Sequence, residues 1–486
     1  MIMKILLFFL VLSSRIFASQ EDVLWCSLDP SSLRQKLLFY ALFPASTHRD
    51  FPFSTHSTTL KWANFFTREI PARILPLTEE ELQEIEPLHA HLSHRRLLGH
   101  VAEKEEDLLL LSSEQIDLAR ALLLSEYPHQ LLAIRSYELL LDTLAQEILQ
   151  KLPREASTIQ KIEAINQLLF EQEGFCFPPN AVFAQEIDRY THLASVLDHK
   201  KGVCLGISAL YLCLAQRINL ALEVITPPGH IYLRCGARNI ETTARGFHTS
   251  SEHYLSPNTC GLQIRSLKEV IGLVWVNQAS IFLQNRDYPQ AILRYEKAKA
   301  FLPEDPFLSE LLGFSLVLAG RKEEGRAILS RISSTPPPHF VCSSPLVREY
   351  LDGCVDAAGV SLLFEEPPKN RSGWLSRKKS LEELLQKFPL FSTGWRGLAD
   401  AWSHLHRPKE TIYALERARQ LDTKDPEILF TLASLYAEKR DFLQAWDSFH
   451  QLQEMLQHTQ HFQRELFTFK RSLLIQFAEP NEPKHE

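Results

Sequence analysis

A repeat of about 34 residues in the second half of the chain limits its fold more than any other feature of the sequence. The repeat is first seen in "VWVNQASIFLQNRDYPQAILRYEKAKAFLPEDP", and one further period reaches a second unit in register. Two proline-rich breaks follow, and two more units then begin near Trp395 and Leu429. A unit of this length buries its apolar face only against its neighbours, so the sequence predicts a stacked helical array.

Small residues recur at one position of each unit. They are Ala279, Gly313, Ala399 and Ala433, and aromatic or large apolar residues recur beside them. Small side chains are needed where two helices cross closely, and the larger ones fill the space next to the crossing. This pattern resembles the tetratricopeptide repeat. It is a packing pattern without catalytic chemistry, so we expect the array to bind a protein or peptide partner.

The composition narrows the class of protein. The chain has 486 residues, of which 45% are hydrophobic, and this length is enough for about two to four domains with sizeable cores. Its formal net charge is −7. A nucleic-acid-binding protein is expected to carry a basic patch or stripe. We therefore expect no nucleic-acid partner.

The N-terminal segment has the layout of a signal peptide. Lys4 precedes the apolar run Ile5 to Leu12, and Ala18 stands before a polar pair. The run is too short to cross a bilayer. We expect residues 1–18 to be removed, leaving an exported protein, periplasmic or secreted, with no transmembrane segment. The alternative is an uncleaved apolar helix on a cytoplasmic protein.

Residues 19–150 are expected to be mostly helical. The stretches "TEEELQEIEPLH", "SSEQIDLARALLLSEYP" and "HQLLAIRSYELLLDTLAQEILQKLP" have apolar residues three and four positions apart. A histidine cluster, His89, His91, His94 and His100, lies within this region. It has no carboxylate or cysteine beside it and carries two arginines, so we interpret it as a solvated helix face and predict no metal site and no cofactor.

The eight cysteines do not form the framework of a small disulfide-rich protein. No CxxC pair is present, which argues against a zinc ribbon or a redox motif. We expect seven of them to be small buried apolar residues, although some could pair in an exported protein. These seven are Cys26, Cys176, Cys213, Cys235, Cys260, Cys342 and Cys354.

The eighth cysteine has a different setting. Cys204 stands where the polar stretch "LDHKKGV" changes into the apolar stretch "CLGISALYLCLAQR". This change predicts that Cys204 lies in the first turn of a helix, where unpaired backbone N–H groups and the helix dipole stabilise a thiolate. Cys213 falls on another side of the same helix, so the two cannot form a disulfide.

The segment after this helix predicts a β-hairpin. "ALEVIT" is expected to be a strand, "PPG" a turn, and "HIYLRC" a strand with His230 and Tyr232 on one face. A two-residue turn at Gly236-Ala237 would place Glu241 diagonally from His230, within about 7 Å. One more residue in the turn would send Glu241 to the other face.

Cys204, His230 and Glu241 together suit thiol chemistry. The thiolate would attack a carbonyl, the imidazole would carry a proton, and the carboxylate would hold the imidazole in one tautomer. Backbone N–H groups at the helix start could form an oxyanion hole. Each residue also has a simpler interpretation, as a core cysteine, a surface histidine and a solvated glutamate. Their order along the chain favours the functional interpretation.

Residues from about 158 to 246 resemble the transglutaminase-like superfamily. "GVC", "PGH" and "NIET" match the Gly-x-Cys, Gly-His and acidic positions of that superfamily in the same order. Within it, the chain is most similar to bacterial SirB-type domains, which are often joined to tetratricopeptide repeats. The resemblance implies a papain-like α+β fold with Cys204 as nucleophile, His230 as general base and acid, and Glu241 as the residue that orients His230. Glu replaces the more common Asp, and many bacterial members lack the cysteine.

We therefore expect a transglutaminase-like cysteine hydrolase or acyltransferase acting on an amide of a protein or peptide. The alternative is a non-catalytic scaffold that uses the repeat array, with an inactive transglutaminase-like module. The predicted parts are a signal peptide (1–18), a helical N-terminal region (19–150), a transglutaminase-like domain (151–265), tetratricopeptide repeats (270–340), an irregular linker (341–376), further repeats (377–460), and a C-terminal helix and tail (461–486).

Overall fold

The computed structural model describes residues 20–30, 32–43, 45–46, 56–67, 71–179, 184–259, 261–334, 345–457 and 462–477. The chain forms two compact units. The first comprises Met1–Pro178 and Tyr190–Leu222, and the second comprises Pro179–Arg189 and Glu223–Glu486. Residues 1–18, Cys260 and Cys342 lie outside the described residues, so the predicted signal peptide and the state of these two cysteines stay predictions.

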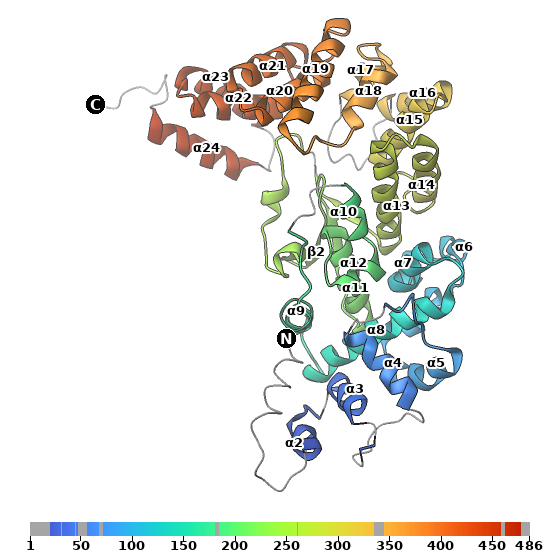
Figure 1. The fold of residues 1–486 in the computed structure, drawn as a ribbon. Helices are drawn as coiled ribbons and strands as arrows, with labels where there is room; N and C mark the ends of the chain where they lie inside the picture. The colour runs from blue at the N-terminus through green and yellow to red at the C-terminus, as the bar shows by residue number, and fades with distance from the viewer. Residues whose placement is uncertain are drawn as a thin grey trace. The chain divides into compact units, whose positions relative to one another are not determined.

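The regular elements of the first unit are helices in its described part (Figure 1). Its α-helices are α2 (Gln20–Ser27), α3 (Leu33–Leu42), α4 (His56–Thr67), α5 (Glu79–Ile85), α6 (Glu105–Leu109), α7 (Leu118–Glu126), α8 (Leu131–Lys151), α9 (Thr158–Asn166), α11 (Leu193–His199) and α12 (Cys204–Arg217). Short 3-10 turns join several of them, namely η1 (Glu86–His89), η2 (Ser93–Arg96), η3 (Leu98–Val101) and η4 (Ser113–Gln115). A π-helical segment, η5 (Gln167–Gln172), continues α9.

The core of the first unit lies around α7, α8 and α12. Nearly every residue of α12 is buried, which explains why its sequence is apolar on all sides. Its one charged residue, Arg217, is also buried, and its Nε lies 2.8 Å from Asp142 Oδ1 in α8. Both side chains are fully buried. The ion pair therefore joins two core helices and gives each buried charge a partner of opposite sign.

The second unit contains a four-stranded antiparallel sheet in the order β3-β2-β1-β4. The strands are β1 (Glu223–Thr226), β2 (Tyr232–Cys235), β3 (Arg238–Ile240) and β4 (Gln263–Arg265). Leu233 pairs with Ile240, and Cys235 pairs with Arg238. The predicted two-residue turn and its register are therefore confirmed.

The rest of the second unit is helical in its described part. After α10 (Ala184–Arg189) and the short turns η6 (Thr242–Ala244) and η7 (Ser251–Tyr254), the helices are α13 (Leu267–Gln284), α14 (Tyr288–Phe301), α15 (Pro306–Leu318), α16 (Lys322–Ser334), α17 (Leu346–Leu351), α18 (Ala357–Phe364), α19 (Arg371–Lys387), α20 (Ser392–His404), α21 (Pro408–Leu421), α22 (Pro426–Glu438), α23 (Phe442–Leu456) and α24 (Gln463–Gln476).

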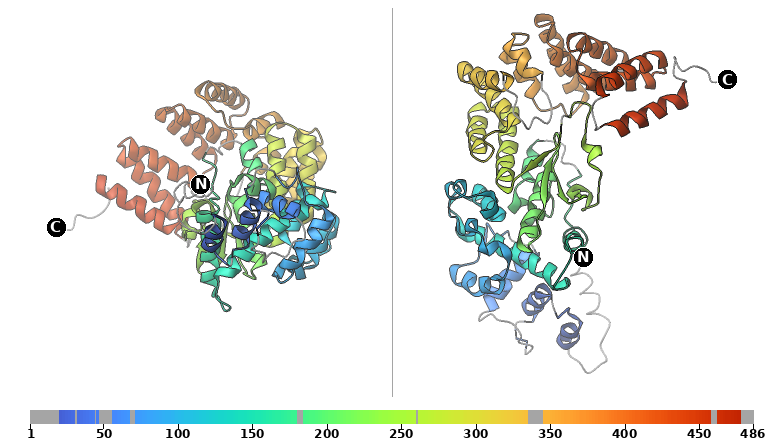
Figure 2. Two further views of the ribbon diagram at one scale, coloured as in Figure 1. Left: turned by 60° about the horizontal axis from the view of Figure 1, so that its bottom comes forward. Right: turned by 180° about the vertical axis from the view of Figure 1, so that it is seen from behind.

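The repeat units are the helix pairs α13–α14, α15–α16, α20–α21 and α22–α23, and consecutive helices pack against one another (Figures 1 and 2). The predicted crossing residues Ala279, Ala399 and Ala433 are buried as expected. Aspartate caps begin several of these helices. Asp305 and Asp425 each accept a backbone N–H of the first turn and precede a proline at the first helical position.

The segment 341–376 differs from the expected irregular linker. Its described residues include α17, α18 and the start of α19. Leu346, Val360 and Trp374 of these helices are buried in the same apolar core as the neighbouring repeats. Pro367 and Pro368 lie between α18 and α19, where a missing N–H breaks no helical hydrogen bond. In the described part of the chain, no helix combines the length and apolar character needed to cross a membrane.

Candidate active site

Cys204 is the first residue of α12, as the sequence predicts. It is a free cysteine and partly exposed. The residue before it, Val203, donates its N–H to the carbonyl oxygen of Tyr190 at 3.0 Å. Tyr211, two turns further along α12, donates its hydroxyl to Asn166 Oδ1 at 3.1 Å. These contacts hold the start of the helix in place, so the thiol sits at the positive end of a helix that is fixed in the core.

His230 and Glu241 meet directly in the second unit. His230 follows the Pro227-Pro228-Gly229 turn, two residues before β2, and Glu241 follows β3 at once. Nε2 of His230 lies 2.7 Å from Oε2 of Glu241. A carboxylate can only accept a hydrogen bond, so Nε2 carries the proton in the neutral imidazole and Nδ1 carries the lone pair.

Glu241 is held in its ionised form by several donors. Its residue is 5% exposed, and its Oε1 accepts the N–H of Thr243 at 3.0 Å and the hydroxyl of Thr243 at 2.5 Å. Its Oε2 accepts hydrogen bonds from His230 and from the Tyr254 hydroxyl. Burial opposes ionisation, but the hydrogen bonds from His230, Thr243 and Tyr254 outweigh it and lower the pKa of Glu241 to about 2.

Tyr254, at the end of η7, contacts both members of this pair. Its ring stacks on the His230 ring at a centroid distance of 5.1 Å and an angle of 18°. It also stacks on the ring of Tyr232, at 4.8 Å and 20°. Tyr232 in turn shares a hydrogen bond with Ser251 Oγ at 2.9 Å. Tyr254 therefore restrains the plane of the imidazole while its hydroxyl restrains the carboxylate.

The sequence alone did not point to Tyr254. It lies outside the predicted hairpin, in the polar stretch "SSEHYLSPN", and neither hydrophobic period nor motif spacing singles it out. The nearest signal is that Tyr254 is an aromatic residue in a polar stretch, and binding and catalytic residues are found disproportionately on loops.

The contact between His230 and Glu241 is compatible with the predicted diagonal arrangement. Diagonal neighbours at a spacing of about 7 Å remain within reach of long side chains, and these side chains form a hydrogen bond. The strand pairing does not extend to Thr243, because β3 ends at Ile240 and Thr242–Ala244 turns into a 3-10 helix. Glu241 caps this helix, since its Oε1 accepts the N–H of Thr243.

The three predicted catalytic residues are divided between the two units. Cys204 belongs to the first, and His230 and Glu241 belong to the second. The structure brings His230 and Glu241 together. The assignment of Cys204 to the same catalytic set stays a prediction. The boundary at Leu222 falls inside the predicted 151–265 domain, and the predicted domain limits also stay predictions.

The burial expected for the other cysteines is wrong in most of the described cases. Cys213 is buried, whereas Cys26 is exposed and Cys176, Cys235 and Cys354 are partly exposed. Short or irregular surroundings expose them, since Cys26 lies in the short helix α2 and Cys354 follows the end of α17.

The histidine cluster is not a solvated helix face. His89 and His94 are fully buried, and the segment forms 3-10 turns in place of one regular helix. The carboxylates missing from the local sequence come from elsewhere in the chain. Asp142 Oδ1 lies 3.2 Å from His94 Nε2, and Asp117 Oδ2 lies 2.9 Å from His100 Nδ1.

Residues 135–266 match the model of the transglutaminase-like superfamily. This range contains Cys204, His230 and Glu241, and it includes the sheet and α12. The chain thus combines a transglutaminase-like domain with a C-terminal array of tetratricopeptide-like helix pairs.

Solved structures with helical repeats show a more distant likeness. The chain is 16% identical to MamA (41-end) from Desulfovibrio magneticus RS-1, over 39% of this chain and 97% of that one, with a TM-score of 0.21. It is also 16% identical to TTC0263, a thermophilic TPR protein in Thermus thermophilus, over 42% and 99% of the two chains, with a TM-score of 0.23. No curated protein matches the chain.

Proposed function

We propose that this protein is an exported cysteine hydrolase or acyltransferase that acts on an amide of a protein or peptide. Cys204 is the nucleophile, His230 is the general base and acid, and Glu241 orients His230. The observation that carries the proposal is the 2.7 Å contact between His230 Nε2 and Glu241 Oε2. A buried carboxylate that holds one imidazole nitrogen leaves the other to accept and return a proton.

The proposed reaction has two balanced steps. In the first, the Cys204 proton passes to His230 Nδ1, the sulfur bonds to the amide carbon, and the C–N bond breaks as the imidazolium gives its proton to the leaving nitrogen. In the second, water or an amine attacks the thioester carbon, and the C–S bond breaks to release the acid or the new amide. His230 carries the proton of the attacking group to the sulfur, which restores the thiol. Glu241 stays ionised throughout and stabilises the imidazolium.

The start of α12 supports the role of Cys204 in this scheme. The first backbone N–H groups of a helix have no partner within the helix, and they can donate to an oxyanion that forms beside the first residue. The helix dipole favours the thiolate at the same place. Cys204 is also partly exposed, which a nucleophile requires.

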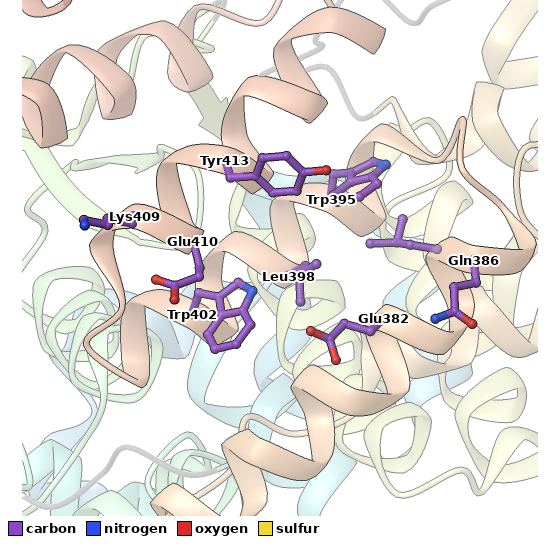
Figure 3. Close-up of a pocket in the computed structure, with 9 residues that line it drawn as sticks. Glu382, Gln386, Trp395, Leu398, Trp402, Lys409, Glu410 and Tyr413 are labelled. Atoms are coloured by element: carbon purple, nitrogen blue, oxygen red, sulfur yellow. The ribbon is translucent and has the colours of Figure 1, made fainter.

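The repeat array supplies a surface for a protein or peptide. Side chains from α19, α20 and α21 surround a cavity of about 590 Å³ that is lined by Trp395, Trp402 and Tyr413 together with Glu382 and Glu410 (Figure 3). Lys409 also lines the cavity and Glu410 is paired with Arg407, so the large aromatic walls suit an extended segment with apolar side chains and do not favour one sign of charge. This cavity favours a second candidate function, a scaffold that binds partners through its repeats without catalysis.

The test is the rate at which Cys204 is alkylated by iodoacetamide as a function of pH, read by mass spectrometry of the full chain. In the wild type, Cys204 is expected to react at pH values where an ordinary thiol, with a pKa of about 8.5, is largely unreactive. His230→Ala should abolish this low-pH reactivity. His253→Ala, at an exposed histidine on η7, should leave it unchanged.

The partly exposed Cys176 and Cys235 serve as internal reference thiols. Glu241→Gln should reduce the reactivity of Cys204 less than His230→Ala, because the imidazole remains but loses its charged partner. If Cys204 reacts no faster than the reference thiols, or reacts alike in wild type and His230→Ala, the catalytic proposal fails and the scaffold function takes its place.

A further inference from the structure

A buried group of titratable side chains in the first unit has no part in the proposed reaction. It consists of His94 in η2, His100 in η3 and Asp117, which caps the N-terminus of α7. The side chains of His94 and Asp117 are fully buried, and that of His100 is 14% exposed. One ring nitrogen of each histidine and one oxygen of Asp117 all lie within 4.8 Å of one another.

The backbone brings these three residues together through two close turns. His94 and His100 stand in consecutive 3-10 turns, and their rings lie perpendicular at a centroid distance of 5.0 Å. Between them, Gly99 packs against the start of α7 so tightly that a Cβ there would lie 2.6 Å from the backbone nitrogen of Asp117. A glycine is therefore required for η3 to approach the N-terminus of α7.

One carboxylate oxygen of Asp117 caps α7, and the other contacts His100. Its Oδ1 accepts the backbone N–H of Ala119 at 3.1 Å as a helix cap. Its Oδ2 lies 2.9 Å from Nδ1 of His100. Burial opposes its ionisation, but the hydrogen bond to His100 and the charge of Arg217 outweigh burial and hold the pKa of Asp117 below its usual value. The site therefore contains a carboxylate anion.

His94 has an unused ligand atom. Its Nδ1 is buried and has no hydrogen-bond partner in the described part of the chain. Its Nε2 lies 3.2 Å from Asp142 Oδ1 without hydrogen-bond geometry, so neither ring nitrogen makes a hydrogen bond in the described part of the chain. A proton on Nε2 would face this carboxylate and leave the Nδ1 lone pair available. A carboxylate behind the far nitrogen is the usual support of a metal-bound histidine.

The surrounding charges come close to balance only when Asp117 is included. Arg95 and Arg217 both contact the single carboxylate of Asp142, at 2.5 Å and 2.8 Å. Both arginines oppose a cation in this place, and their ion pairs with Asp142 offset part of that repulsion. The two imidazoles and the Asp117 carboxylate are a donor set that divalent transition metals bind.

We propose that His94, His100 and Asp117 bind one divalent transition-metal ion, with zinc as the ion that best suits these donors. At Zn–ligand distances of about 2.0–2.2 Å, two ligand atoms on one ion lie no more than about 4.4 Å apart, so a small rotation of the rings closes the site. The ion would join both 3-10 turns to the start of α7 and would leave a coordination position for water.

The test uses the full chain, stripped of metal with a chelator and titrated with zinc chloride. Zinc per chain is measured by equilibrium dialysis and mass spectrometry, and thermal melting is followed with and without zinc. The ligand variants are His100→Gln and Asp117→Asn. The control is His91→Gln, an exposed histidine three positions before His94. Cobalt(II) replaces zinc in a parallel titration because a thiolate ligand would produce a charge-transfer band that imidazole and carboxylate do not.

The wild type and His91→Gln are expected to bind one zinc ion and to melt at a higher temperature with zinc. Loss of a residue that only supports a metal ligand typically weakens metal binding by roughly 10–100-fold. Each ligand variant should weaken zinc binding by more than this. The proposal is overturned if the wild type retains no zinc, if His100→Gln binds it equally well, or if cobalt shows thiolate ligation.

A second measurement applies if both ligand variants fail to fold. Diethyl pyrocarbonate modifies accessible histidines of the wild type, and the modified positions are mapped by mass spectrometry. Zinc should protect His100 and leave His91 reactive. Equal modification of His100 with and without zinc overturns the proposal on the wild-type protein alone.

Discussion

Gly206→Ala tests whether the start of α12 depends on close packing. Gly206 is the third residue of α12, two positions after Cys204. An added Cβ would overlap the carbonyl oxygen of Tyr190 and would lie 2.9 Å from a methyl carbon of Val196. The Tyr190 carbonyl accepts the N–H of Val203, so it cannot move away without weakening the hydrogen bond that holds the residue before Cys204.

Two effects of opposite sign decide the result. Replacing glycine by alanine inside a helix stabilises it by up to about 1 kcal/mol. Overpacking a tight contact costs about 1–3 kcal/mol, and a weakened backbone hydrogen bond adds about 1 kcal/mol. The sum is a destabilisation of about 1–3 kcal/mol, which corresponds to local opening of α12 that is roughly 5- to 150-fold more frequent.

Hydrogen exchange of α12 peptides in the full chain, followed by mass spectrometry, measures this opening directly. The matched control is Gly397→Ala in α20. There an added Cβ would meet Leu363 and Leu381 at ordinary contact distances of 3.5 Å or more. The control should slow exchange in α20 by up to about fivefold, the gain from helix propensity alone. If Gly206→Ala slows exchange in α12 or leaves it unchanged, the packing argument is wrong.

Three further predictions concern polar groups. Tyr254→Phe keeps both ring stacks but removes a hydrogen bond to the charged Glu241, so exchange in the 238–247 peptides should quicken by an amount that corresponds to about 1.5 kcal/mol. Because the pKa of Glu241 is lowered from 4.5 to about 2, its contribution to stability is present above about pH 4.5 and is lost as the pH falls towards 2. Thermal melting between pH 6 and pH 3 should therefore fall more steeply in the wild type than in Glu241→Gln. Asp142→Asn weakens the partner of Arg95 and the buried Arg217, and we expect it to cost about 3–5 kcal/mol, seen as a lower melting temperature.

Each of these predictions has a control and a contrary result. Tyr232→Phe loses only a neutral hydrogen bond to Ser251 and should quicken exchange less than Tyr254→Phe; an equal effect would remove the special role of Tyr254. If the melting temperatures of wild type and Glu241→Gln fall in parallel between pH 6 and pH 3, Glu241 is not the group whose protonation lowers the stability. Glu79→Gln, at an exposed ion pair with Arg135, should cost less than about 1 kcal/mol. A similar cost for Asp142→Asn would contradict the buried ion pair.

Much of the fold could be predicted because it follows from local spacing. The 34-residue period located the helix pairs, since each pair repeats the same contacts at the same positions. The change from "HKKGV" to an apolar run located the start of α12 at Cys204, and the Gly236-Ala237 turn predicted the register of β2 and β3. The prediction of an irregular linker failed because prolines mark only where helices end. The prolines between Ala357 and Arg371 are compatible with a helix on each side of them.

The candidate site was predicted only in part. Sequence order and the hairpin placed His230 near Glu241, but Tyr254 and Thr243 became visible only in three dimensions. Strand parity predicts which face a side chain occupies. It does not predict that the chain leaves the strand at Ile240 and turns the carboxylate inward.

The sequence by itself determined the repeat array, the helix that begins at Cys204 and the hairpin that carries His230, because residues a few positions apart set these features. Only the tertiary structure decided which polar side chains are buried together. His94 and Asp142, or His100 and Asp117, are distant in sequence, and their contact depends on how whole helices pack. A cluster that resembles a solvated face in the sequence can thus lie in the core, where carboxylates from other helices stabilise it.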